Sequence, residues 1–130
     1  MTDAELFNKF DNGKYYTQGS EVDLSGIKWN KHAKFEGVEM KDVILGSQTG
    51  GAFSYHLIKI EPGKSIGLHT HATQVETHEV ISGKGVGTIG GAKYEYVPGA
   101  LALLPVGVEH SVDAGRDGLQ LLAKFIPALK

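Results

Sequence analysis

Three histidines and one glutamate form the pattern in this chain that is best suited to chemistry. His69 and His71 are separated by one residue, Glu76 follows after four more, and His110 lies well downstream. Alternate residues of a β-strand point to the same face, so a strand would present the imidazoles of His69 and His71 side by side. In a helix these positions lie roughly 200° apart and could not share one ion. Three imidazoles and one carboxylate suit a divalent transition metal.

The residues around the two histidines favour a strand. Thr70 is β-branched, and Ile66 and Leu68 alternate with the histidine positions. Pro62-Gly63 marks a turn before this segment. The same pattern continues downstream, where Glu76, His78 and Val80 would share one face of a strand.

Composition narrows the class of protein. A chain of 130 residues with 41% hydrophobic and 22% charged residues is expected to form one globular domain. The net charge of −2 gives no electrostatic case for nucleic acid or a membrane surface as partner. Without cysteine, the chain has no disulfide, thiolate zinc site or cysteine nucleophile. The N-terminus lacks the features of a signal peptide, and no apolar run approaches the roughly 20 residues of a membrane span, so we expect cytoplasmic residence.

One short helix is expected at the N-terminus. Thr2 and Glu5 have the spacing of a capping box, and Phe7 and Phe10 lie at helical spacing. Asp11-Asn12-Gly13 should end the helix. The helix could lie across the main body or against a partner subunit. We assign residues 1–20 to this helix and an arm, and residues 21–130 to a single barrel.

From Tyr15 onward the pattern is strand, turn, strand, and the 18 glycines indicate many tight turns. The expected strands are Glu21–Leu24, Val38–Leu45, Ala52–Ile60, Ile66–His71, Glu76–Ser82, Val86–Ile89, Ala92–Val97, Ala100–Leu104, His110–Ala114 and Leu119–Phe125. Short strands at this spacing predict an all-β sandwich or barrel. In the last strand Leu119, Leu121, Ala123 and Phe125 should face the interior.

Two segments have the spacing of a known pair of motifs. The first runs from Gly63 through His69-x-His71 and Glu76 to Gly83. The second runs from Gly99 through Pro105-x-Gly107 to His110. Together they resemble the two signature motifs of the cupin superfamily, in the right order, over about Pro62 to Ala114.

The resemblance implies a small jelly-roll barrel, a double-stranded β-helix. In such a barrel His69, His71, Glu76 and His110 would converge on one metal ion, which in cupins is commonly iron, manganese, nickel, cobalt or zinc. Pro105-x-Gly107 would shape the turn that delivers His110. Ala114 departs from the asparagine that usually ends the second motif, and this position is not a ligand.

His78 is our candidate catalytic residue, because it should lie beside Glu76 and the expected metal. Three roles stay open: it could replace a ligand, hold the carboxylate of Glu76 from outside the ligand shell, or act as a general acid–base near neutral pH. The structural alternative is a buried neutral histidine bonded to a backbone carbonyl.

Three further signals carry less weight. Gly85-x-Gly87-x-x-Gly90 matches a dinucleotide fingerprint, but a strand pattern follows it where a helix is required, so we interpret the glycines as hairpin residues. His56 could line the cavity, and a structural role is the preferred interpretation. The basic segment 28–34 is interpreted as a solvated surface anchored by Trp29.

Two functions remain. The first is a metal-dependent enzyme of the dioxygenase, isomerase or lyase type that acts on a small oxygenated organic molecule. The second is a non-catalytic cupin that binds or senses a small molecule or a metal. By analogy with small cupins we also expect a homodimer, with Glu21–Leu24 and the helix near Phe7 as candidate contacts.

Overall fold

The structure begins with the helix that the capping box predicts. In the computed structural model, which describes residues 1–130, α1 spans Asp3–Asp11. The Thr2 hydroxyl accepts a hydrogen bond from the backbone N–H of Glu5 at 3.1 Å, and Asn12 is the C-cap. A helix of nine residues is too short to cross a bilayer, and the structure has no helix with the length and apolarity that crossing requires.

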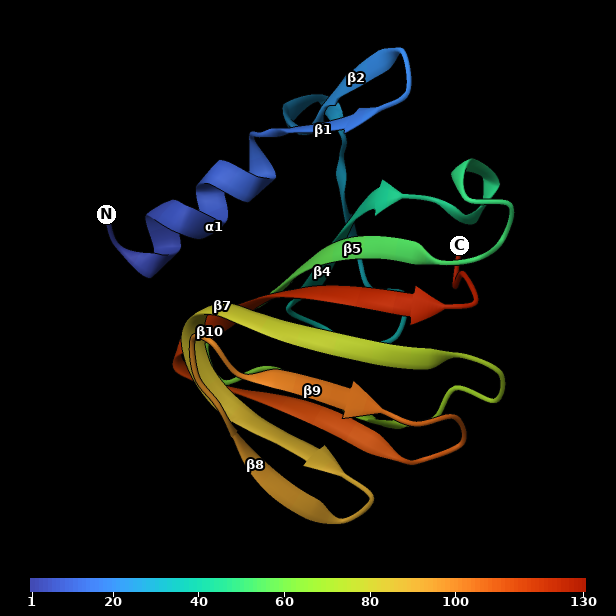
Figure 1. Ribbon diagram of the computed structural model, residues 1–130. Coiled ribbons are helices and arrows are strands. Elements are labelled where there is room, and N and C mark those ends of the chain that lie inside the picture. The colour runs from blue at the N-terminus through green and yellow to red at the C-terminus, as the bar shows by residue number, and fades with distance from the viewer.

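Ten strands and two short 3₁₀ turns follow. The strands are β1 Lys14–Thr17, β2 Ser20–Asp23, β3 Trp29–Lys31, β4 Val38–Ile44, β5 Ser54–Ile60, β6 Ser65–His69, β7 Val75–Ile89, β8 Ala92–Tyr96, β9 Leu101–Leu104 and β10 His110–Ile126; the 3₁₀ turns are η1 Leu24–Gly26 and η2 Gly46–Gln48. β1 and β2 form a separate hairpin beyond the end of α1 (Figure 1). The other eight strands form one sheet in the order β3-β4-β5-β10-β7-β8, with β6 beside β10 and β9 beside β7.

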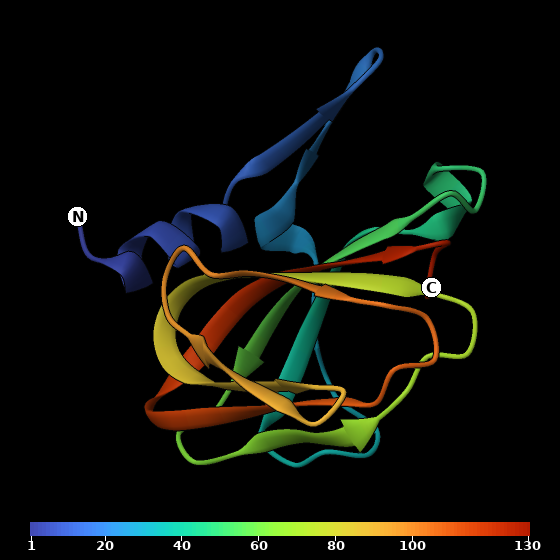
Figure 2. The same ribbon diagram turned by 60° about the horizontal axis from the view of Figure 1, so that its bottom comes forward.

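The two longest strands run through both layers of the barrel. The first half of β7 pairs with β9 and with the end of β10, whereas its second half pairs with β8 and with the start of β10. The curved path of β7 is visible in Figure 2. Because β7 and β10 stay paired along this path, they connect the part of the sheet that contains β9 to the part that contains β8.

Glycines allow the bend in these strands. We predicted turns at residues 82–85 and 115–118, each between two separate strands, and this prediction was wrong, because β7 and β10 each continue through the segment. The register of β10 against β7 shifts there instead, between Ala114 and Leu119. A side chain at Gly83 would place its Cβ 2.1 Å from the carbonyl oxygen of Gly118, so only glycine lets the two backbones approach so closely.

Two strands were missed by the sequence analysis. β1 and β3 are short and mostly exposed, so they lack the alternation that marks a strand with one buried face. The expected strand Glu21–Leu24 corresponds to β2, which pairs with β1 and ends at Asp23. Leu24 instead begins η1, where its side chain is buried.

The main core lies between the layers of the barrel. The inward set predicted for the last strand is confirmed: Leu119, Leu121 and Ala123 of β10 are fully buried, and Phe125 is nearly so. Val80 of β7 joins the same cluster. The all-β barrel that the sequence analysis predicted is confirmed by this arrangement.

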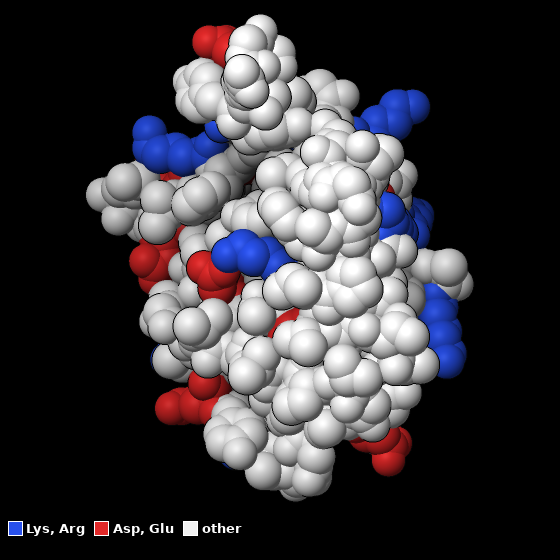
Figure 3. Space-filling model, turned by 45° about the vertical axis from the view of Figure 1, so that its right-hand side comes forward, with Lys and Arg blue, Asp and Glu red and all other residues white.

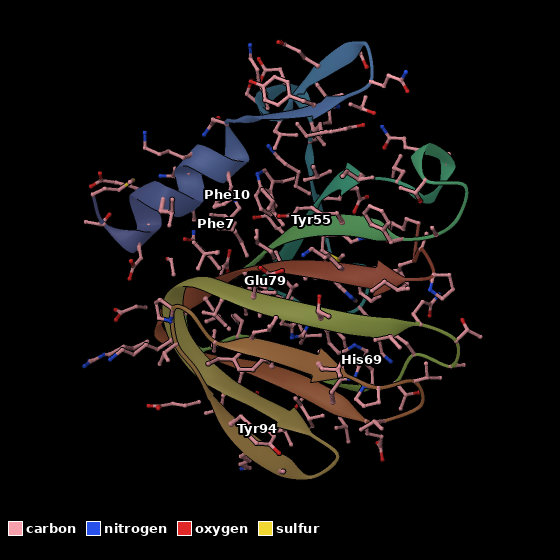
Figure 4. The ribbon with its side chains drawn as sticks, in the orientation of Figure 1. Phe7, Phe10, Tyr55, His69, Glu79 and Tyr94 are labelled. Carbon is pink, nitrogen blue, oxygen red and sulfur yellow. The ribbon has the colours of Figure 1, made fainter.

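A second hydrophobic cluster joins α1 to the outside of the barrel. Phe7 is fully buried and packs with Leu57 of β5 and Leu122 of β10. Figure 4 shows Phe7 on the side of α1 that faces the sheet. The helix therefore lies across the main body of its own chain. The homodimer stays a prediction, and Phe7 would contribute little exposed surface to it.

A buried lysine also holds the N-terminal region in place. Lys41 of β4 is 2% exposed, and its Nζ donates hydrogen bonds to the carbonyls of Leu24 at 2.7 Å and of Asp11 at 2.9 Å. The same Nζ forms an ion pair with the Asp11 carboxylate. Trp29 Nε1 donates to that carboxylate at 3.0 Å, so Trp29 has the anchoring role predicted for it.

Candidate metal centre

The four predicted ligand residues meet at one place in the barrel. His69 ends β6, Glu76 is the second residue of β7, and His110 begins β10. His71 lies just beyond the strand that we expected to contain it, in the loop to β7. Each residue offers one ligand atom, and these four atoms lie within 4.8 Å of one another. A group with this composition and spacing could bind a metal ion.

Strand pairing and a turn bring the histidines together. His110 pairs directly with His69 in the β10–β6 ladder, and their ring centroids lie 4.2 Å apart. The centroid of His71 lies 5.1 Å from that of His69. The backbone N–H of Gly107 donates to the carbonyl of His71 at 2.9 Å. The turn of the second motif is therefore bonded to the loop of the first.

Backbone carbonyls orient two of the imidazoles. His69 Nδ1 lies 2.7 Å from the carbonyl oxygen of Gly67, and His110 Nδ1 lies 3.1 Å from that of Val108. A carbonyl only accepts, so each Nδ1 must carry the proton and donate it. In the neutral ring this leaves Nε2 as a free lone pair, the form that ligates metal.

The centre of the cluster holds two polar atoms that are buried without hydrogen-bond partners, Glu76 Oε1 and His110 Nε2. They lie 3.2 Å apart, and His71 Nε2 lies 3.3 Å from the same oxygen. Burial without a partner costs about 1–3 kcal/mol for each group, so such atoms need an explanation. A cation bound between them would satisfy both, so the residues present fit a metal ion.

The cluster also favours an ionised glutamate. Burial alone would raise the pKa of Glu76, but contacts with the imidazoles of His110, His71 and His78 outweigh it and hold the pKa well below its usual range. Burial, together with the neighbouring histidines, lowers the pKa of His69. Burial acts in the same direction on His110, but Glu76 reverses the effect and raises its pKa.

His78 lies behind the glutamate. Its Nε2 is 2.7 Å from Glu76 Oε2, and its Nδ1 is 2.8 Å from the hydroxyl of Tyr96. An ionised carboxylate only accepts, so Nε2 donates, and in the neutral ring Nδ1 accepts from Tyr96. Burial raises the pKa of Tyr96, and Glu76 adds to this, so the hydroxyl keeps its proton. These contacts match one of the roles considered for His78, that of holding the carboxylate of Glu76 from outside the ligand shell. The catalytic role of His78 stays a prediction.

Tyr96 reaches His78 only because Gly87 has no side chain. A Cβ at Gly87 would lie 2.3 Å from Tyr96 Cε1. We expect Gly87→Ala to displace the ring and to lower the free energy of unfolding by about 1–3 kcal/mol, the usual cost of overpacking. Gly26→Ala is a matched control, because its Cβ would meet nothing within 4 Å. Urea unfolding of both variants measures the difference, and equal midpoints would contradict the expectation.

The cluster opens into a mostly apolar cavity of about 220 Å³. Ile66, Val112 and Phe125 contribute to its wall, and His32 and Lys34 also line it. Figure 4 shows His69 near the end of the barrel that carries the β6–β7 loop. The space-filling view of the right-hand side of Figure 1 shows a face with charged residues mostly at its margins (Figure 3).

His56 lies outside this cavity in a closed polar chain. It is fully buried; its Nδ1 lies 2.7 Å from Asp42 Oδ1 and its Nε2 lies 2.8 Å from Ser54 Oγ. Ser54 Oγ accepts from the backbone N–H of Leu129 at 2.9 Å. These hydrogen bonds connect the three residues in the order of a Ser-His-Asp triad. Ser54 is buried, however, and does not line the cavity, so no substrate could reach it. The contacts agree with the preferred structural interpretation of His56.

Other sequence signals have structural explanations. Gly85 and Gly87 lie within β7, and Gly90 turns the chain into β8, so these glycines belong to a hairpin as interpreted. Sequence reasoning missed Tyr96, whose signal was a small residue, Gly87, on the strand that pairs with its own. Segment 28–34 was interpreted as a solvated surface; Lys34 is exposed as this interpretation expects, and His32 and Lys34 also line the cavity.

Comparison with solved structures supports the same fold. A protein from Thermotoga maritima described as a predicted oxalate decarboxylase is 27% identical, with a TM-score of 0.71 over 79% of this chain and 95% of that one. Ectoine synthase from P. lautus is 25% identical, with a TM-score of 0.66 over 73% and 67%. An RmlC-like cupin from Shewanella frigidimarina is 15% identical, with a TM-score of 0.73 over 92% and 96%, and shows the fold alone.

A comparison with curated proteins found no match. A family model described as the cupin domain matches residues 56–122, just over half of the chain. The matched range contains both motifs from His69 to His110, and the resemblance inferred from these residues is confirmed. The chain is a member of the cupin domain family.

Proposed function

We propose that this cupin binds one divalent transition metal ion, of the set iron, manganese, nickel, cobalt and zinc, through His69, His71, Glu76 and His110. The observation that carries the proposal is the pair of buried atoms without partners at the centre of the cluster, Glu76 Oε1 and His110 Nε2. The donor set supports it, since neutral imidazoles and a carboxylate suit these ions.

We further propose that the metal serves an enzyme that acts on a small oxygenated organic compound. A metal with open coordination positions can polarise a carbonyl, activate water or bind dioxygen. The apolar wall of the cavity would limit the entry of water. Two structural neighbours are described as a predicted decarboxylase and a synthase, and this supports a lyase-type or related reaction.

His78 would serve this site in one of two ways. It lines the cavity and donates to Glu76 Oε2, so it fixes the carboxylate as a ligand. It could also exchange a proton with a bound substrate, as a general acid–base. Because both ring nitrogens are already bonded within the chain, proton transfer would require one of these bonds to open.

The same observation favours the second candidate function, a non-catalytic cupin that binds or senses a small molecule or the metal itself. His78, the additional imidazole beside Glu76, has both ring nitrogens hydrogen-bonded within the chain, so it offers no free acid or base next to the candidate ligands. Elemental analysis of anaerobically purified protein tests the metal, since the enzyme and a cupin that binds or senses metal both predict about one equivalent. Absence of metal after purification, together with no uptake from added salts, would contradict both.

The variant His78→Phe separates the proposed roles. It removes the hydrogen bond to Glu76 Oε2 but none of the four ligands. We expect the variant to bind one equivalent of metal at saturation, with affinity about 10–100-fold weaker, which is typical of losing a partner outside the ligand shell. Competition with a metal-sensitive dye measures the affinity. Complete loss of metal would identify His78 as a ligand.

A further inference from the structure

The segment between β3 and β4 forms part of the rim of the cavity. Three of its residues, His32, Lys34 and Phe35, line the same space as His69 and Glu76. We call residues 32–35 the rim segment.

The rim segment is held in one conformation. His32 Nδ1 accepts hydrogen bonds from the backbone N–H groups of Lys34 at 3.0 Å and Phe35 at 3.2 Å. The His32 and Phe35 rings lie 4.9 Å apart, and the Phe35 ring lies 6.0 Å from that of His69. A Cβ at Gly67 would lie 2.8 Å from Phe35 Cε1, so Gly67 makes room for the ring against β6. These contacts place the rim segment beside the candidate ligands.

The hydrogen bonds also define what His32 can offer. Since Nδ1 accepts from two backbone N–H groups, the proton of the neutral ring is on Nε2. Burial, together with Lys130 and Lys34, lowers the pKa of His32 and so favours this neutral form. His32, which lines the cavity, therefore has an Nε2–H donor that forms no hydrogen bond within the chain.

With the proposed divalent ion bound, the cavity would carry an excess of positive charge. Among the lining residues, Lys34 and Glu76 are the only ones with a lysine, arginine, aspartate or glutamate side chain. Lys34 is exposed and forms no ion pair within the chain, whereas Glu76 is buried among imidazoles. The positive charge of a divalent ion at the cluster would exceed the single negative charge of Glu76, and the charge of Lys34 would add to the excess. A ligand with a negative charge would restore the balance.

We propose that the substrate or effector is a small carboxylate, held at the rim by Lys34 Nζ and His32 Nε2–H, with its apolar part against Phe125 and Ile66. This inference rests on the proposed metal site, because part of the positive charge comes from the metal. One ammonium and one neutral donor match the two oxygens of a carboxylate; a phosphate would call for more donors. The cavity of about 220 Å³ is smaller than the ~300–1,000 Å³ typical of sites for drug-sized ligands, so the compound is small.

The test compares two probes that differ in charge. Metal-loaded protein is titrated with propionate and with propionamide, and binding is followed by calorimetry or by ligand NMR. We expect propionate to bind at least about tenfold more tightly, since a hydrogen bond to a charged group is worth about that much. Lys34→Met should remove most of this preference and leave propionamide unaffected. Lys31→Met is the matched control, because Lys31 is exposed and does not line the cavity.

A second variant tests the histidine donor. His32→Asn keeps a side-chain oxygen that can accept from the two backbone N–H groups, but it has no donor in the place of Nε2–H. We expect weaker binding of propionate with an unchanged thermal midpoint. A fall in the midpoint without any change in binding would overturn the role of His32.

The outcomes separate this inference from the proposed function. Elemental analysis of every sample precedes the titrations, and a wild-type protein that takes up no metal would overturn both. Metal-loaded protein that binds propionate and propionamide equally, or whose preference survives Lys34→Met, would overturn the carboxylate site alone. Tighter binding of inorganic phosphate than of propionate would do the same.

Discussion

His71→Ala should lose most of its bound metal. The substitution removes one of the four ligand atoms, which lie within 4.8 Å of one another, and leaves Glu76 Oε1 with one imidazole fewer. Loss of a partner outside the ligand shell already costs about 10–100-fold in affinity, so loss of a ligand should cost at least ~100-fold. Elemental analysis after dialysis measures the stoichiometry, and an unchanged value would contradict the assignment of His71.

Thermal unfolding provides a second measurement of the same variant. Metal that binds only the folded state stabilises it by about 2.7 kcal/mol at a concentration 100 times the dissociation constant. Wild-type protein should therefore melt at a higher temperature with metal than with a chelator, and His71→Ala should show little difference. His32→Asn is the control, because His32 is not among the four ligand residues. If His32→Asn also lost the metal-dependent shift, the ligand set would need revision.

Asp11→Ala should be strongly destabilising. It leaves the ammonium of Lys41, which is 2% exposed, without its carboxylate, and it removes the acceptor of Trp29 Nε1. Removing one partner of a buried ion pair typically costs about 3–5 kcal/mol. We expect this loss in the free energy of unfolding, measured with urea or guanidinium chloride.

Two further variants test the cause of this loss. Asp117→Ala is the control, since Asp117 forms no ion pair and lies in an exposed part of β10. The double variant Asp11→Ala/Lys41→Met should recover part of the loss, because it removes the uncompensated charge while keeping an apolar side chain of similar length. Equal effects of Asp11→Ala and Asp117→Ala would show that the buried ion pair does not stabilise the attachment of α1.

The four candidate ligand residues could be recognised from the sequence because metal chemistry restricts both residue type and spacing. His69, His71 and Glu76 lie within eight positions of the chain, so their residue types and spacing form a local pattern that can be recognised. His110 was recognised only through the second motif, since a ligand far along the chain gives no local signal. The alternation in Leu119–Phe125 identified the inward face of β10 for a similar reason, because burial on one face of a strand imposes a period of two.

The residues that support the site depend on contacts between distant segments. Tyr96 reaches His78 because Gly87, on the neighbouring strand, leaves space for its ring. His32 and Lys34 line the cavity because Phe35 packs where Gly67 has no side chain. The contact of Tyr96 with Gly87 and that of Phe35 with Gly67 leave no periodic pattern in the sequence. The bend at Gly83 and Gly118 was mistaken for two turns, since a glycine where strands approach closely looks the same in sequence as a glycine in a turn.

The path of β10 has a consequence for when the metal could be acquired. His110 begins a strand that lies between β7 on one side and β5 or β6 on the other. During synthesis the first three ligands leave the ribosome well before this strand is complete. In the folded structure His110 meets the other three residues through the pairing of β10 within the sheet. We therefore expect full coordination of the proposed metal to be a late event in maturation, with the metal taken up by a chain that is largely folded.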